Sequence, residues 1–567
     1  MNVTYLESAA ILVEDEHTKV LCDPWLVDGA YYGSWAHYPD PDFEPEDFDD
    51  VDYIYISHIH PDHFDPATLE RMDSDIPVLV HDYRWDYLKN AIEDLGFEVT
   101  ELPHGERTHL GDGMHINVLA ADGCDPELCG NFFGCSWYDE KADETGSTQV
   151  DSMAVIDNGE FTLVNTNDCP YPIAESSCRK IKRDYGDIDM LCHQYSAAQF
   201  YPQAVTNYDH ERKIRERDRV IREKHELALD FLDLFEPDYY MPFAGEYVLA
   251  GDLAHLNEYT ANPPREQAKA FFETHAPDDS ECVFLNSGEH VSLASGEKSA
   301  EFEPVDQQAK REYVEEVLAE REFDYETDPI PTLGELLSYV PYAYRNLADK
   351  REQIGFTSDT TVLLPLVGDV FLELSMDGSG YRFVADADTD DYDGWVKLDV
   401  DPRLLKRLFE GPHSAYWADA KIGSHVGISK EPDVYERGLY NCLGSFHAHG
   451  YDVEPTDSIR VRDGTESGTE TTDAARGSGS QAGATPDDAT PAASDGESAT
   501  CADCGASLDT DSDRHVRHAR SDADGRTAND GGAVVFCIDC GVAKLNDDVA
   551  PDGEGGGDSA GDREAAE

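Results

Sequence analysis

The densest group of potential metal ligands in the sequence is "SHIHPDHFD", which follows an alternating apolar run that ends at Ser57. The two-residue period of a strand places His58 and His60 on one side of the chain, and Asp62 and His63 follow in a turn toward a helix. Imidazoles with a carboxylate suit zinc, iron or manganese, and two ions a few ångströms apart would share the donors. The pattern predicts a site for one or two metal ions that activate water or oxygen.

A second metal motif consists of "CADCG" and "CIDCG", two CxxCG pairs in the last part of the chain. Four thiolates are a typical ligand set of tetrahedral structural zinc, and such an ion lets a segment with little core fold. We therefore predict a zinc-binding segment over residues 501–545, with one structural zinc held by Cys501, Cys504, Cys537 and Cys540.

Alternating strands and amphipathic helices surround the first motif, and they indicate an α/β unit over residues 1–300. A hairpin over "AAILVED" and "TKVLCDPW" is expected before the motif. Two strands joined by a turn at residues 157–159, a helix over residues 207–235 and a short strand in "EPDYYMPFAG" are expected after it. This order of elements favours two sheets with helices outside them, a four-layer αββα sandwich.

The remainder of the chain divides by composition. Residues 301–454 begin with a charged helix and contain paired alternating runs and a closing helix, which predicts a smaller α+β accessory domain. Residues 455–500 contain almost no aromatic or branched apolar side chains, so we expect a disordered linker. A disordered acidic tail, 546–567, is expected after the zinc-binding segment.

Acidic side chains dominate the whole sequence. Asp and Glu number 119 against 43 Lys and Arg, giving a formal net charge of −76. Molar salt shortens the screening length to about 3 Å and removes most of the self-repulsion, so we expect a salt-loving source. This charge argues against nucleic acid and anionic membranes as partners. Scattered single cysteines, with no signal peptide or long apolar run, favour a cytoplasmic protein without a membrane span.

The H-x-H-x-D-H pattern after an apolar strand resembles the metallo-β-lactamase superfamily over residues 1 to about 265. The resemblance implies that His58 and His60 hold a first metal and that Asp62 and His63 belong to a second. Asp168, at the end of "LVNTND", matches the aspartate that bridges the two metals in that superfamily.

Two departures from the superfamily pattern affect the expected ligand set. Asp151, in "TQVDSMAV", stands where many relatives carry a histidine, so a carboxylate-rich site is expected. The place of the last histidine, after "YYMPFAG", is taken by Pro242 and Phe243. His255 is a possible substitute ligand, and His193, in "MLCHQYSAAQF", is another.

A narrower resemblance joins several segments. "LCDPWLVDGAYYGSW", "VNTNDC", "QYSAAQFYP" and "KIGSHVGISKEPDVYERGLYNCLGSFHA" are similar to the catalytic region of CMP-N-acetylneuraminate hydroxylase, over roughly residues 1 to 450. That family implies oxygen chemistry with electrons from a Rieske cluster, which needs paired Cys-x-His and Cys-x-x-His segments. Neither pair occurs in this sequence. Oxygenation would therefore require a separate Rieske or ferredoxin partner, whereas hydrolysis requires none.

Three functions are consistent with these observations. The first is a metal-dependent hydrolase of a small molecule, most simply a phosphoester or ester, in which Asp62 and Asp168 are catalytic residues. The second is an iron-dependent oxygenase component with a separate electron donor. The third is a catalytically inactive binding protein whose zinc-binding segment recruits a protein partner.

Overall fold

The computed structural model describes residues 1–83, 85–111, 113–120, 151–385 and 387–455. It also describes the short stretches 459–462, 498–500, 507–509, 515–519, 533–537, 542 and 544–546. Within this part of the chain, none of the helices has both the length and the apolar character that crossing a membrane requires.

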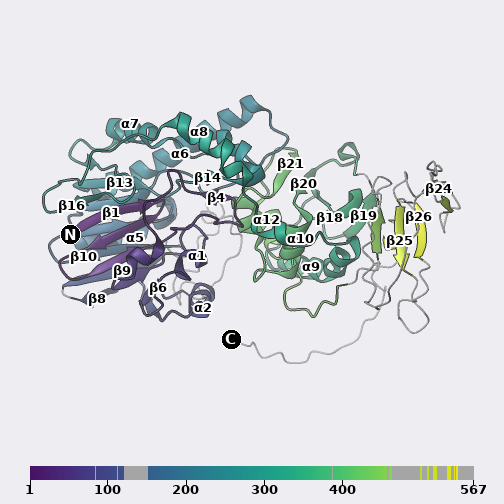
Figure 1. The fold of residues 1–567 in the computed structure, drawn as a ribbon, viewed down its shortest axis with the longest axis horizontal. Helices are drawn as coiled ribbons and strands as arrows, with labels where there is room; N and C mark the ends of the chain where they lie inside the picture. The colour runs from purple at the N-terminus through teal and green to yellow at the C-terminus, as the bar shows by residue number, and fades with distance from the viewer. Residues whose placement is uncertain are drawn as a thin grey trace, which may run out of the picture.

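Two seven-stranded sheets form the centre of the first domain (Figure 1). The strands of the first sheet, in spatial order, are β16 (His290–Ser292), β1 (Asn2–Glu7), β2 (Ala10–Glu14), β3 (Lys19–Cys22), β5 (Tyr53–Tyr55), β6 (Val78–His81) and β7 (Val99–Leu102). Those of the second are β15 (Glu281–Cys282), β13 (Tyr239–Phe243), β12 (Met190–Gln194), β11 (Thr162–Asn165), β10 (Ser152–Asp157), β9 (Met114–Ala120) and β8 (Arg107–Gly111).

Helices cover the outer face of each sheet. Against the first sheet lie α1 (Pro66–Leu69) and α2 (Tyr87–Asp94), and against the second lie α5 (Tyr171–Tyr185), α6 (His210–Phe235) and α7 (Arg265–His275). Figure 1 shows α6 and α7 along the top of this domain and α1 and α2 along its lower edge. The four layers are those predicted from the sequence.

The strand sequences explain why both faces of each sheet are covered. Along β10, Ala154 and Ile156 pack into the core between the sheets, whereas Met153 and Val155 pack under the helices. Successive side chains of a strand point to opposite faces, so an uninterrupted apolar run needs two apolar layers around it. The predicted hairpin of β2 and β3 and the antiparallel pair of β10 and β11 are both present.

The accessory domain is built on a five-stranded sheet in the order β19 (Gly380–Ala385), β18 (Val370–Ser375), β17 (Thr361–Pro365), β20 (Trp395–Asp399) and β21 (Gly427–Glu431). Its helices are α9 (Leu333–Gln353), α10 (Pro402–Glu410), α11 (Trp417–Ile422) and α12 (Arg437–Gly444). The charged helix α8 (Gln307–Glu316) precedes them. One apolar core joins the sheet to α9, α10, α11 and α12 and begins at Phe323, whereas Val314 of α8 packs with Ala36 and Val248 of the first domain.

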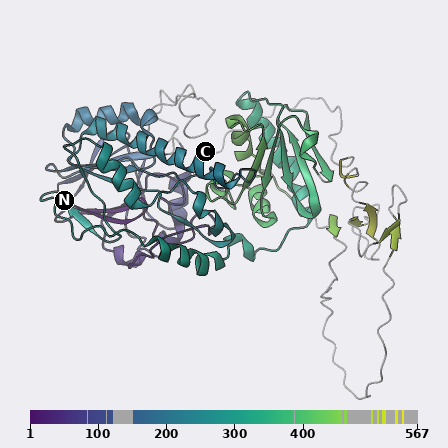
Figure 2. The same ribbon diagram turned by 90° about the horizontal axis from the view of Figure 1, so that it is seen from above.

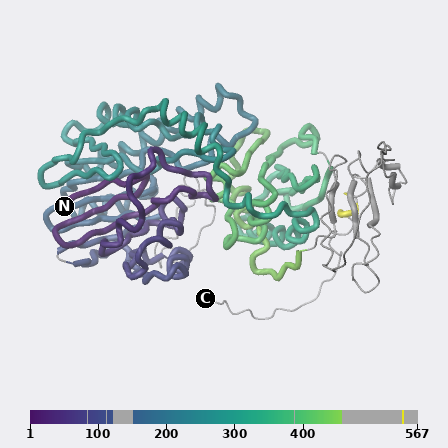
Figure 3. Tube along the Cα trace, in the orientation of Figure 1, coloured from purple at the N-terminus to yellow at the C-terminus, as the bar shows by residue number. Residues whose placement is uncertain are grey.

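The two domains lie side by side in both ribbon views, and the trace shows them meeting along one boundary (Figures 2 and 3). Part of that boundary is a strand-like pairing. The backbone N–H of Thr206 donates to the carbonyl of Ile428, and the N–H of Ile428 donates to the carbonyl of Ala204, both over 2.8 Å. A segment of the first domain thereby adds itself to the β21 edge of the accessory sheet.

The predicted linker is not without structure throughout. Its early residues form β22 (Ile459–Arg462), which pairs with β25 (His515–Ala519), and β25 pairs in turn with β26 (Ala533–Cys537). A shorter pair joins β23 (Ser498–Thr500) to β24 (Ser507–Asp509). The predicted zinc ligands Cys501, Cys504 and Cys540 lie outside the described residues, and the zinc site stays a prediction.

Candidate metal centre

The ends of several strands meet at one edge of the first domain and bring the predicted ligands together. Strands β3 and β5 are parallel neighbours, so Asp23 and the segment that continues from β5 to His58 leave the first sheet at the same edge. In the second sheet β11 is antiparallel to β10, so the segment after its end, with Asp168, lies near Asp151 at the start of β10. The metal motif and the two downstream aspartates therefore meet although about 100 residues separate them in the sequence.

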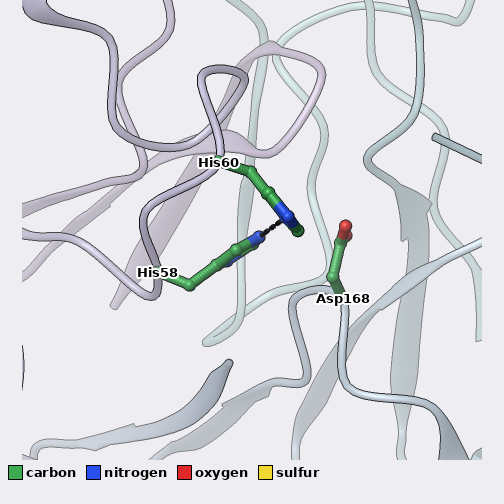
Figure 4. A group of neighbouring side chains, drawn as sticks. All are labelled: His58, His60 and Asp168. Carbon is green, nitrogen blue, oxygen red and sulfur yellow. Dashed lines mark hydrogen bonds between the residues drawn. The ribbon is translucent and has the colours of Figure 1, made fainter. Parts of the chain in front are cut away.

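Two groups of donors share one carboxylate. His58, His60 and Asp168 form one group and Asp62, His63 and Asp168 the other, with the ligand atoms of each group within 4.8 Å of one another. Figure 4 shows the rings of His58 and His60 directed toward Asp168. The Nε2 of His58 and the Nδ1 of His60 are 2.8 Å apart.

The second group and Asp151 complete the cluster. His63 Nε2 lies 3.7 Å from Asp62 Oδ2 and 3.5 Å from Asp168 Oδ1. Asp151 Oδ1 lies 3.7 Å from His58 Nε2. The structure thus gathers six of the seven non-cysteine residues predicted as ligands.

His255 is the predicted residue that is not gathered. Its side chain is exposed on a 3₁₀ segment, Gly251–Tyr259, and its Nδ1 lies 2.7 Å from the carbonyl oxygen of Asp252. Neither donor group includes it, and its part in metal binding stays a prediction. The alternative, His193, is buried between Tyr240 and Phe272 in the layer between the second sheet and its helices. Burial there lowers its pKa to about 4, as expected for a neutral core histidine.

Buried atoms without partners test whether the cluster suits a metal. Within the described residues, His63 Nε2 and Asp151 Oδ1 are buried and make no hydrogen bond. Such atoms are costly unless something else satisfies them. Nitrogen and carboxylate lone pairs that converge at these distances fit a divalent transition-metal ion. The residues present therefore fit the metal that the motif implies.

The charges of the cluster also favour a cation. Burial raises the pKa of Asp151 to about 6 and raises that of Asp62. Burial alone would lower the pKa of His63, but the carboxylates of Asp168, Asp62 and Asp23 outweigh it and raise that pKa well above its usual range. Burial makes the ionised form of these carboxylates unfavourable. A bound metal cation would neutralise their charge and so stabilise that form.

A further set of residues orients the ligands, and the sequence alone did not single out their roles. Asp23 accepts from the backbone N–H of Ser57 over 2.7 Å and from its hydroxyl over 2.6 Å, and lies 2.8 Å from His63 Nδ1. Its carboxylate therefore leaves His63 Nε2 free to face the centre, as partners of metal-binding histidines do. One feature of the sequence could have indicated this role of Asp23: it is a charged residue directly after the apolar strand β3, which is the neighbour of β5, the strand before the metal motif.

On the other side, Gln194 and Lys224 support Asp168. The amide of Gln194 donates to Asp168 Oδ1 over 2.9 Å, and Lys224 Nζ donates to the Gln194 carbonyl over 3.0 Å. Lys224 lies on α6, among residues of which many are exposed or half-buried. This one lysine faces the site.

Two side chains reach Asp62. The hydroxyl of Tyr31 donates to Asp62 Oδ1 over 2.6 Å, which leaves Oδ2 directed at His63. Asp419, on α11 of the accessory domain, lies close enough that its charge and that of Asp62 affect one another. Burial first and Asp62 second raise the pKa of Asp419 to about 7.

Comparison with known proteins agrees with this architecture. Residues 2–127 match the sequence model described as "Beta-lactamase superfamily domain". Together with the two sheets, the helices outside them and the ligand-bearing strand ends, this match shows a mixed α/β protein with the metallo-β-lactamase fold.

Curated relatives match a similar part of the chain. A Mycobacterium tuberculosis protein (strain H37Rv) with the name "Putative Rieske 2Fe-2S iron-sulfur protein" is 29% identical over 275 residues, 46% of this chain and 47% of its own. A protein of similar name from Mycolicibacterium smegmatis is 30% identical over 209 residues, 36% of this chain and 35% of its own. The chain thus spans about half or less of the length of these relatives.

Solved structures are more distant. An isothiocyanate hydrolase from Delia radicum gut bacteria has 17% identity and a TM-score of 0.36, over 52% of this chain and 99% of its own. The diiron β-hydroxylase CmlA from Streptomyces venezuelae has 16% identity and a TM-score of 0.32, over 50% of this chain and 53% of its own.

Proposed function

We propose that this protein is a metal-dependent hydrolase that holds two divalent cations and cleaves a small phosphoester or ester. The observation that carries the proposal is the pair of donor groups that share Asp168, together with two buried atoms that make no hydrogen bond: His63 Nε2 in the second group and Asp151 Oδ1 beside the first. Cations bound there would lower the pKa of a coordinated water to about 7 and supply a nucleophile at neutral pH.

The protein's own residues would hold and orient the reacting groups. His58, His60 and Asp151 face one position, Asp62 and His63 face the other, and Asp168 lies between them. The side chain of Asp168 is 14% exposed, so solvent can reach this part of the cluster. The oxygen of Asp62 that does not accept from Tyr31 would serve as ligand or proton acceptor.

A second candidate is an iron-dependent oxygenase component that receives electrons from a separate Rieske or ferredoxin protein. The carboxylate of Asp151, in a position where a histidine was expected, makes the donor set harder and better suited to iron. The names of the mycobacterial relatives support the same candidate. The identity of the bound metal distinguishes the two functions.

Metal content, measured by elemental mass spectrometry on the full chain in high salt, is the first experiment. The variant His58→Ala with His60→Ala is compared with wild type and with a control, His109→Ala with His115→Ala. The control removes two neighbouring histidines, with ring centroids 5.0 Å apart, from the β8–β9 hairpin. We expect the first variant to lose one or two zinc or manganese ions and the control to lose none.

Four outcomes would change the proposal. Iron that is present in the wild-type protein and lost from the variant His58→Ala with His60→Ala would favour the oxygenase. Metal content that is equal in all three proteins would contradict a metal centre at the motif. A metal-loaded protein that hydrolyses neither bis(p-nitrophenyl) phosphate nor p-nitrophenyl acetate would contradict hydrolysis of simple phosphoesters and esters, and hydrolysis that survives removal of the metal by a chelator would contradict its dependence on metal.

A further inference from the structure

The loop that carries Tyr31 has an unfavourable backbone conformation. Tyr31 and Tyr32 have φ of 53° and 60°, in the left-handed region, and Gly33 follows with φ of 92°. Left-handed geometry is uncommon for bulky residues, and two in succession need support from their surroundings. Residues in such conformations gather at functional sites when the surrounding structure fixes them.

The support comes from the accessory domain. The ring of His425 is buried, with Nε2 at 2.8 Å from the carbonyl oxygen of Tyr31 and Nδ1 at 3.0 Å from the hydroxyl of Tyr325. A carbonyl oxygen accepts and does not donate, so Nε2 carries the proton and Nδ1 accepts from Tyr325. Ser424, next to His425, is itself left-handed with φ of 66°. Residues on both sides of this contact, Tyr31 and Ser424, therefore have the unfavourable left-handed backbone conformation.

Two further contacts act on the same turn. The hydroxyl of Tyr32 accepts from the backbone N–H of Tyr416 over 2.8 Å. At Gly423, an added Cβ would lie 2.8 Å from the Cβ of Tyr31 and 2.9 Å from the hydroxyl oxygen of Ser34. The accessory domain thus lies against this turn so closely that no side chain fits between them.

We propose that His425 of the accessory domain is a positioning residue for the metal centre: by fixing the turn at Tyr31, it holds the Tyr31 hydroxyl on Asp62 Oδ1 and so aims Oδ2 at the metal. The inference rests on the proposed metal-dependent function. The accessory domain then completes a site whose ligands all belong to the first domain.

The test compares metal affinity in two substitutions at one position, in the full chain and in high salt. His425→Gln keeps an N–H donor for the Tyr31 carbonyl, whereas His425→Leu keeps bulk and removes the donor. His413→Ala, an exposed histidine of the same domain, is the control. Titration with Mn²⁺, followed by electron paramagnetic resonance, reports each binding step, and circular dichroism reports whether each variant is folded.

We expect His425→Leu to weaken one of two binding steps about tenfold or more, the range seen when partners of metal ligands are removed. His425→Gln and His413→Ala should bind like wild type. Tyr31→Phe should weaken the same step, and its combination with His425→Leu should be no weaker than Tyr31→Phe alone, because both act through one hydroxyl.

A folded His425→Leu variant with wild-type affinity would overturn the inference, and so would additive effects in the double variant. If His425→Leu does not fold, Gly423→Ala is the alternative, because its added methyl group would displace the same turn at Tyr31. Unchanged Mn²⁺ binding in Gly423→Ala would also overturn the inference. Failure of the proposed function is a different result, in which the wild-type chain binds no Mn²⁺ that depends on His58 and His60.

Discussion

At the scale of single residues, Glu7 shows how a buried carboxyl group affects stability. It ends β1 and is 5% exposed, near Glu246 and Arg265. Burial, with a smaller contribution from Glu246, raises its pKa from 4.5 to about 7, although His37 and Arg265 act in the opposite direction. The folded protein therefore holds this proton more tightly than the unfolded chain does.

The sign of the pH dependence follows from that difference. The stabilisation is complete below pH 4.5 and is lost as the pH rises to about 7. We expect Glu7→Gln to unfold less readily than wild type at pH 8, by on the order of 3 kcal/mol, and to match it more closely at pH 5. Urea unfolding at constant salt measures this, with the exposed Glu16→Gln as control. A gap between Glu7→Gln and wild type that did not grow with pH would contradict the assigned shift.

At the scale of elements, the sequence correctly predicted turns, strands and helices that depend on interactions between residues close together in the chain. The turn at Asp157, Asn158 and Gly159 joins β10 to β11 as expected, because Asn158 accepts from two backbone N–H groups that follow it and Gly159 takes a positive φ. The strand β13, which contains Pro242, and the long amphipathic helix ending at Phe235 were also predicted.

Contacts between distant segments were not predictable in the same way. The roles of Asp23, Lys224 and His425 depend on which strands become neighbours and on how two domains meet, which no periodicity encodes. The position of His255 was not predictable either, because it lies on an exposed 3₁₀ segment that the sequence pattern did not indicate.

The pairing of residues 204–206 with β21 can be tested at the same scale. Thr206→Pro removes the N–H that donates to Ile428, whereas Thr206→Ala keeps it. We expect the proline variant to lower the temperature of unfolding and to speed hydrogen exchange at the Ile428 amide. The alanine variant should change either quantity much less. Equal exchange at Ile428 in both variants would mean that this pairing does not hold the domains together.

At the scale of the whole molecule, the last described residues return to the accessory domain. Val542 and Leu545 are buried in its core, and the side chain of Asn546 exchanges two hydrogen bonds with the backbone of Phe383 on the edge strand β19. The C-terminal part of the chain thereby covers a sheet edge that would otherwise be open to pairing with another molecule.

Truncation after residue 455 measures what this covering contributes. We expect the remaining chain to fold and to stay soluble in high salt, but with a less stable accessory domain, because burial of each such side chain contributes about 1.5–3 kcal/mol. Leu545→Ala in the full chain should reproduce part of the loss. Insolubility of the truncated chain would refute independent folding, and unchanged stability would refute a contribution from the C-terminal residues.

The contact between Tyr31 and His425 joins residues 394 positions apart, which gives the order of synthesis a consequence. A ribosome adding about 5–20 residues per second makes His425 roughly 20 to 80 seconds after Tyr31. During that interval every ligand of the metal centre through Asp168 emerges before the domain that fixes the turn exists. Metal taken up by the nascent chain would thus enter an unfinished site, and its retention would be decided only after the accessory domain has been made.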